Sequence, residues 1–169
     1  MDKELKYNEA LAPFLDIVEQ VYAPKDQELW RWCHNPINEN DFVVQAENPI
    51  NVSNINIESA SDEDKIEYIK RYALSAYTTY GNAVAAYMEN REVRVGRRGE
   101  QDGVKFDEQK GAYVLQIHVK PEHGICDNPS EGHGHVNILT YKDVNPQDMA
   151  TGDPIPVKPQ DNNNEENAL

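Results

Sequence analysis

The sequence has little from which a membrane span or a disulfide scaffold could be built. It contains two cysteines, three phenylalanines and three methionines in 169 residues, so at most one internal disulfide can form. In a reducing compartment we expect both thiols to stay free. No apolar run approaches the ~20 residues of a membrane helix, and the charged first residues do not resemble a secretion signal. These absences predict a soluble, cytoplasmic protein with no membrane partner.

Basic residues are also scarce, since 16 Lys and Arg stand against 30 Asp and Glu, for a net charge of −14. Residues 1–64 carry fourteen acids and four bases, whereas residues 65–144 carry eleven of each. A basic field is needed to contact phosphates, so we expect no direct nucleic-acid binding. An acidic surface fits a basic protein partner, but it also serves solubility alone.

The length of the chain suits one domain with its own core. We predict a single α+β domain over residues 1–151 and a disordered acidic tail over residues 152–169. The domain is expected to hold a small, mainly antiparallel sheet and two or three helices. Helical spacing of apolar residues and capping residues place these helices near 13–22, 61–73 and 82–90. Residues rich in Val, Ile and aromatic side chains predict strands at 28–33, 74–79, 93–95, 113–120 and 135–141. Residues 34–60 and 96–111 are expected to be loops.

Residues 118–135 hold four of the five histidines and one of the two cysteines. If the strands on either side of this segment pair as a hairpin, their alternation places four polar residues on one face. A one-residue slip in register would undo this arrangement. The four residues are Gln116, His118, His135 and Asn137.

Imidazole and thiolate are the ligands that zinc prefers, so the segment is a candidate zinc site. The candidate ligands are His118, His123, Cys126, His133 and His135. Their spacing matches no zinc-finger or metalloprotease pattern, which favours the alternative of an exposed loop whose histidines make ordinary hydrogen bonds. His118 and His135 are also candidates for acid–base catalysis, because imidazole titrates near neutral pH.

The basic residues that do occur are concentrated in one place. Arg91, Arg94, Arg97 and Arg98 lie within eight residues. Guanidinium groups bind phosphate or carboxylate through paired hydrogen bonds, so Arg94, Arg97 and Arg98 are candidate ligand-binding residues. The alternative is a solvated face that offsets the acids of the chain.

Four stretches together resemble an uncharacterised family of small bacterial proteins, which implies no activity. They are Trp30–Trp32, Pro36–Phe42, Leu74–Thr79 with Ala83 downstream, and Gly134–Ile138. More specifically, an arginine on an early strand and a Ser-x-x-Thr strand before a helix are similar to ADP-ribosyltransferase-type domains. That resemblance implies that Arg31 with Ser75 or Thr78 would hold a nicotinamide dinucleotide. The family's catalytic glutamate has no matching strand position here, because Glu122 and Glu131 are expected in loops.

Three functional hypotheses follow. The first is a binding domain that recognises a ligand or a basic partner through residues 118–135 and an acidic surface. The second is an enzyme acting on a nucleotide-like substrate, with Arg31, Ser75 and the arginine cluster holding the substrate and His118 or His135 moving protons. The third is a structural module supported by zinc.

Overall fold

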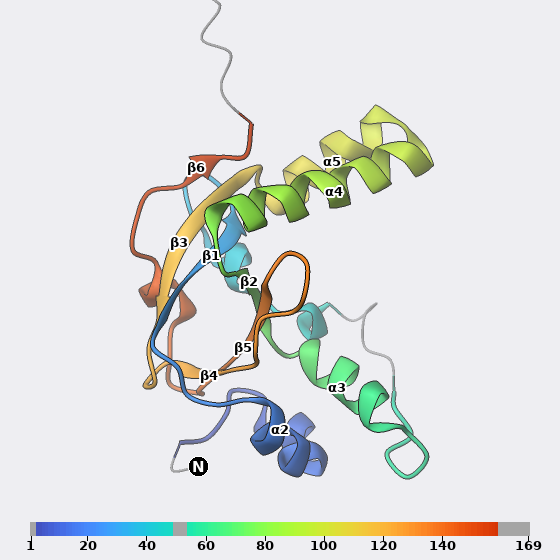
Figure 1. Cartoon of the computed structure of the whole chain (residues 1–169), viewed down its shortest axis with the longest axis vertical. Coiled ribbons are helices and arrows are strands. Elements are labelled where there is room, and N and C mark those ends of the chain that lie inside the picture. Colours follow the sequence, from blue (N-terminus) through green and yellow to red (C-terminus); the bar gives the residue numbers. More distant parts are fainter. Residues whose placement is uncertain (1–2, 49–53, 159–169) are drawn as a thin grey trace, which may run out of the picture.

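A six-stranded antiparallel sheet lies at the centre of the structure (Figure 1). The computed structural model describes residues 3–48 and 54–158. Neighbouring strands follow the order β4-β5-β2-β1-β3-β6. With the helices described below, this confirms the α+β class. The strands are β1 (Gln27–Cys33), β2 (Leu74–Tyr77), β3 (Tyr113–Val119), β4 (Gly124–Cys126), β5 (His135–Thr140) and β6 (Ile155–Pro156).

One face of the sheet is covered by irregular chain rather than by long helices. Three short 3-10 helices lie in these segments: η2 (Glu39–Phe42), η3 (Gln45–Glu47) and η5 (Pro146–Met149). Phe42, Val44 and Met149 from these segments pack against the aliphatic side chains of the central strands. The long connection after β1 therefore supplies core residues although it has little regular structure.

The opposite face carries two groups of helices that are separated in Figure 1. The first group comprises α1 (Asn8–Leu11), η1 (Ala12–Phe14), α2 (Leu15–Val21) and α3 (Asp62–Lys70), and it covers the β4–β5 end. The second comprises α4 (Tyr80–Arg98) and α5 (Glu100–Lys110) and covers β1 and β3. We call the second group the arm. No helix in the described part of the chain is both long and apolar enough to cross a membrane.

Local signals placed several elements correctly. Ser61 caps α3, accepting the backbone N–H of Asp64 at 3.1 Å. The helix expected near Pro13 is present as η1 and α2. Four helices longer than one turn, α2 to α5, occur among the described residues, compared with the two or three expected.

The prediction for residues 93–111 is wrong. The expected strand at 93–95 lies inside α4, and the expected loop at 96–111 is mostly α5. Valines and glycines suggested a strand and a loop, but here a glycine lets two helices approach closely. A Cβ on Gly103 would lie 2.6 Å from Cγ2 of Val95 and 3.0 Å from the guanidinium carbon of Arg91. Tertiary packing thus overrides the local preference.

The predicted hairpin between β3 and β5 is also wrong, because β2 and β1 lie between these strands. β3 pairs with β1, whereas β5 pairs with β2 and β4. The predicted alternation nevertheless holds. Cross-strand partners share a face, and they link Gln116 to Trp30, Trp30 to Tyr77 and Tyr77 to His135. The polar residues of β3 and β5 therefore share one face of the sheet, but two strands separate them.

The ordered domain extends beyond residue 151. β6 pairs with the start of β3, and Val157 packs beneath the arm. The prolines and acids of this region favoured a tail, but Ile155 pairs with Val114 in the sheet and Val157 supplies apolar contacts that the prediction overlooked. The rest of the predicted tail, residues 159–169, lies outside the described residues.

Candidate functional site

β1 and β2 are joined by one residue pair, Trp30 with Tyr77. Beside this pair the Arg31 guanidinium bridges the two strands. Its Nε donates to the carbonyl of Asp41 at 2.6 Å, and Nη1 donates to the carbonyl of Ser75. Burial lowers the pKa of Arg31 to about 10, and the charge of Asp41 opposes this shift. Arg31 stays charged at neutral pH, and its hydrogen bonds are made within the fold rather than to a ligand.

One group of polar side chains on the helical face comes from β2, β5 and the residue after β4. Ser75 lies opposite Asn137 in the ladder, and Tyr77 lies opposite His135. Asp127 accepts the backbone N–H and the side-chain Nδ2–H of Asn137, both at 2.7 Å. Asp127 and Asn137 are buried, whereas Ser75 is exposed. We call Ser75, Asp127, His135 and Asn137 the polar floor.

His135 is half-buried, and its ring stands edge-on to Tyr77 with 5.3 Å between centroids. Burial lowers the pKa of His135. The charges of Lys70 and Arg31 lower it further, while Asp127 raises it. Its ring nitrogens make no hydrogen bond to any described residue. A neutral imidazole has one donor and one acceptor, so His135 can both give and take a hydrogen bond or accept a proton.

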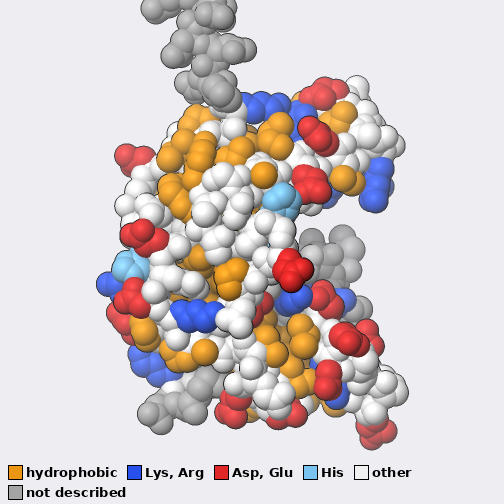
Figure 2. All heavy atoms as spheres, viewed as in Figure 1, with side chains coloured by type: hydrophobic (Ala, Val, Ile, Leu, Met, Phe, Trp, Pro, Cys, Tyr) orange, Lys and Arg blue, Asp and Glu red, His pale blue; other side chains and the backbone are white. Residues whose placement is uncertain are grey.

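A hollow between the arm and α3 is visible at the edge of the molecule in Figure 2, and β2 and β5, which carry most of the polar floor, lie between these helices in Figure 1. On the α3 side, Lys70 pairs with Glu67 at 2.6 Å. On the arm side, Glu89 pairs with His133 of the β4–β5 loop, residues 127–134. The hollow is therefore bordered by charges of both signs.

Tyr22 adds a buried hydroxyl beside the floor. The segment that follows it pairs with β4 through Ala23 and Cys126. Tyr22 is 4% exposed, and its hydroxyl has no hydrogen-bond partner within the described ranges. Burial raises the pKa of Tyr22, and Asp127 and Glu67 add to the shift. The hydroxyl is therefore protonated and able to donate.

Thr78 holds the β4–β5 loop in place. Its N–H donates to the carbonyl of Gly134 at 3.1 Å, and its Oγ1 accepts Nδ2–H of Asn82 at 3.1 Å. Gly134 has φ +59°, and a Cβ there would lie 2.2 Å from Oγ1 of Thr78. Thr78 thus supports the loop beside His135, and its hydroxyl is already engaged.

The structure does not bring the five candidate zinc ligands together. His118 pairs with Asp26 at 2.6 Å, and His123 accepts the N–H of Lys120 at 3.1 Å. Cys126 is buried on the other face of the sheet, and burial raises its pKa to about 11. No three His, Cys, Asp or Glu residues within 3–48 and 54–158 are grouped to hold a metal ion. The zinc hypothesis has no assembled site here.

The arginine cluster is also separate from the floor. Arg91 is buried within the arm, where it pairs with Glu100 and Asp107. Arg94 lies 3.8 Å from Asp102, while Arg97 and Arg98 are exposed at the end of α4. The remaining predicted residue, Gln116, donates to Glu28 at 3.1 Å on the far side of β1.

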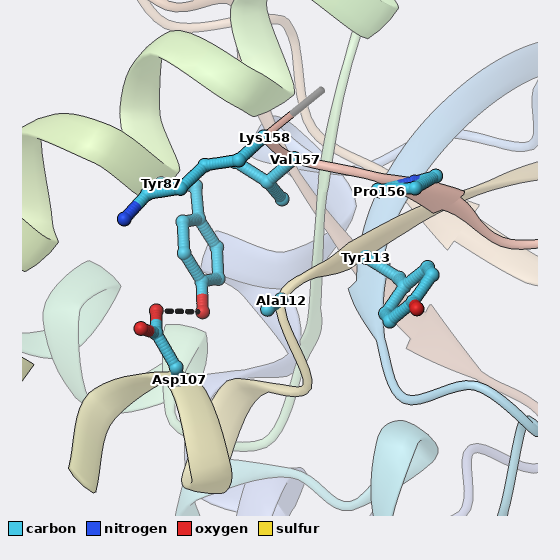
Figure 3. Close-up of a pocket in the computed structure, with 7 residues that line it drawn as sticks. All are labelled: Tyr87, Asp107, Ala112, Tyr113, Pro156, Val157 and Lys158. Carbon is cyan, nitrogen blue, oxygen red and sulfur yellow. Dashed lines mark hydrogen bonds between the residues drawn. The ribbon is translucent and has the colours of Figure 1, made fainter. Parts of the chain in front are cut away.

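A cavity of about 180 Å³ lies between the base of the arm and β6 (Figure 3). Its walls are largely apolar, and its main polar contact is the Tyr87 hydroxyl donating to Asp107 at 2.8 Å. The candidate residues predicted from the sequence do not line it. The lining residues are Tyr87, Asp107, Ala112, Tyr113, Pro156, Val157 and Lys158.

Asp127 and Tyr22 are the site residues that the sequence did not indicate. An acid directly after a strand of three residues carries little signal, and Tyr22 approaches the site only through tertiary structure. Glu122 and Glu131 lie in turns, outside the strands. No protein-family model, curated protein or solved structure matches this chain.

Proposed function

We propose that this chain is a binding domain that recognises a polar ligand, or a polar segment of a partner, on the polar floor. One observation carries the proposal: the half-buried, neutral His135 has no hydrogen-bond partner for its ring among the described residues. The ring nitrogens are not among the buried polar atoms without a partner, so they are open to an incoming group. A ligand on the floor can therefore pair with this ring without displacing a bond of the fold.

The groups around His135 favour a ligand of low net charge. Asp127 and Glu67 are offset by Lys70 and Arg31, all of which act on the pKa of His135. Ser75 and Tyr22 offer hydroxyls, one exposed and one buried. A ligand with adjacent donors and acceptors, such as an amide or a diol, matches these groups.

The nucleotide-handling alternative has less support. Arg31, which the ADP-ribosyltransferase resemblance assigns to a dinucleotide, is engaged by two carbonyls of the fold. The exposed arginines lie at the end of α4 and not on the floor. A phosphate-bearing ligand would therefore lack a free guanidinium at this site.

Thermal melting in the presence of sugars, amino-acid amides, nucleotides and nicotinamide dinucleotide tests the proposal. A ligand present at about 100 times its Kd stabilises the folded state by about 2.7 kcal/mol. We expect an amide or a sugar to raise the Tm of the wild type, and His135→Gln with Ser75→Val to abolish that shift.

His118→Gln is the matched control, because it removes a histidine from the same sheet face at a different site. It should leave the ligand-induced shift intact. Equal shifts in the wild type and in the His135→Gln variant would contradict the proposal, and a shift with nucleotides alone would favour the alternative.

A further inference from the structure

The arm is a rigid projection of the fold. The buried Arg91 on α4 pairs with Glu100 at 2.6 Å and with Asp107 at 2.9 Å, both on α5. The close approach at Gly103 adds contact between the two helices. A surface on this helix pair is therefore already ordered, and an ordered surface loses little entropy when it binds.

The outer half of α4 presents apolar and basic side chains together. Val93 is 47% exposed, and Arg97 and Arg98 form no ion pair with any described residue. Glu89, Val93 and Arg97 are spaced four residues apart and so share one side of the helix. Because Glu89 pairs with His133 beside the hollow, this side of α4 faces the hollow. We call Val93 and Arg97 on this side, together with the exposed Arg98 that ends α4, the basic strip.

A complementary surface lies at the other end of the molecule, where α3 begins (Figure 1). Ile57 is 46% exposed there, and exposed carboxylates follow it in the sequence, among them Glu58 and Glu63. Glu58 and Glu63 form no ion pair within the part of the chain that the structure describes. We call Ile57, Glu58 and Glu63 the acidic patch.

We propose that the basic strip of one molecule docks on the acidic patch of a second copy of this chain. Each surface has an exposed branched aliphatic side chain beside unpaired charges, and the two charge signs are opposite. Within one molecule the outer end of α4 and the start of α3 lie far apart (Figure 1), so the two surfaces meet only between copies. This inference is independent of ligand binding on the polar floor.

The geometry predicts how the assembly grows. The two surfaces differ, so the contact is heterologous and leaves one surface free at each end. Copies then add head to tail instead of stopping at a symmetric dimer. The net charge of −14 opposes association at long range. At about 0.1 M salt the Debye length is about 10 Å, so this repulsion is screened while the direct contact persists.

Sedimentation velocity of the full chain over a range of concentrations tests the proposal. The wild type should sediment faster as its concentration rises. Two variants, Arg97→Glu/Arg98→Glu and Glu58→Arg/Glu63→Arg, should each remain monomeric, because each then carries two surfaces of like charge. An equimolar mixture of the two variants should associate again, since each supplies the surface that complements the other.

A Lys120→Glu/Lys142→Glu variant controls for net charge, because it makes the same change of charge as the arm variant at exposed sites elsewhere. It should associate like the wild type. Wild-type protein that stays monomeric at every concentration would overturn the proposal. A mixture of the two reversed variants that sediments as two monomers would do so as well.

Discussion

At the scale of single residues, hydrogen bonding and burial shift the pKa values of two histidines in opposite directions. His34 contacts acceptors through both ring nitrogens: Nδ1 lies 2.5 Å from a carboxylate oxygen of Asp41, and Nε2 lies 2.8 Å from the carbonyl oxygen of Glu108. These hydrogen bonds, first to Glu108 and then to Asp41, raise the pKa of His34. His135 has no such partners, and burial lowers its pKa. His34, which lies outside the sequence cluster, is thus a histidine whose charged form the fold stabilises.

The stability of the protein should therefore depend on His34 and on pH. Because its folded-state pKa is raised, the stabilisation is fully present below the unfolded pKa of about 6.5. It is lost as the pH rises through the folded pKa. Urea midpoints measured across this range should show the wild type more stable than His34→Gln at low pH. The two should converge at high pH.

The difference between the two proteins isolates His34, because His135 is present in both and its contribution, which has the opposite sign, cancels. A depressed folded pKa makes the contribution of His135 fall as the pH falls. His123→Gln, a change at a turn residue, should follow the wild-type profile. A constant difference in stability between wild type and His34→Gln at every pH would show that the charged ring of His34 stabilises the fold no more than the neutral ring does.

At the scale of elements, the sequence shows where a strand or helix starts more reliably than it shows what the element packs against. The cap at Ser61 and the alternation in β3 and β5 depend on neighbouring residues, and the structure confirms both. The strand partners depend on contacts between distant segments, and the predicted hairpin is wrong for that reason. The glycines of the arm led to the wrong prediction of a loop for a similar reason. What each glycine does depends on the segments that approach it, and these differ from one position to the next.

Two of those glycines should respond in opposite ways to the same substitution. Gly111 ends α5 with φ +94°, and a Cβ there would lie 2.1 Å from the carbonyl oxygen of Cys33. Gly111→Ala should lower the free energy of unfolding by more than about 1 kcal/mol. Gly96 lies inside α4 with nothing within 4 Å of its Cβ position. Gly96→Ala should raise that free energy by about 0.5–1 kcal/mol.

Chemical denaturation of both variants measures these changes, with Gly152→Ala as a neutral comparison in open space. A loss of stability in Gly96→Ala would be incompatible with a helix at this position. It would instead support the polar loop that the sequence predicts for residues 96–111.

At the scale of the whole molecule, the spacing of apolar residues along the chain sufficed to predict the α+β class but not the site. The face that carries Gln116, His118, His135 and Asn137 could be predicted, because side chains alternate along any strand. Which of them lie together depends on the strand order. That order separates the β3 pair from the β5 pair and brings Ser75 to Asn137 instead. Asp127 joins them through a loop conformation that no local pattern encodes.

The single residue pair between β1 and β2 divides the sheet into two halves with a joint between them. β1, β3 and β6 form one half, which carries most of the contacts of the arm, and β2, β4 and β5 form the other, which carries the polar floor. Bending at this joint would widen or narrow the hollow without breaking either ladder. We expect backbone amides at the joint to exchange with deuterium faster than those along the ladder between β1 and β3. Equal protection from exchange throughout the sheet would instead show that the two halves move as one rigid unit, held together by the hydrogen bonds of Arg31.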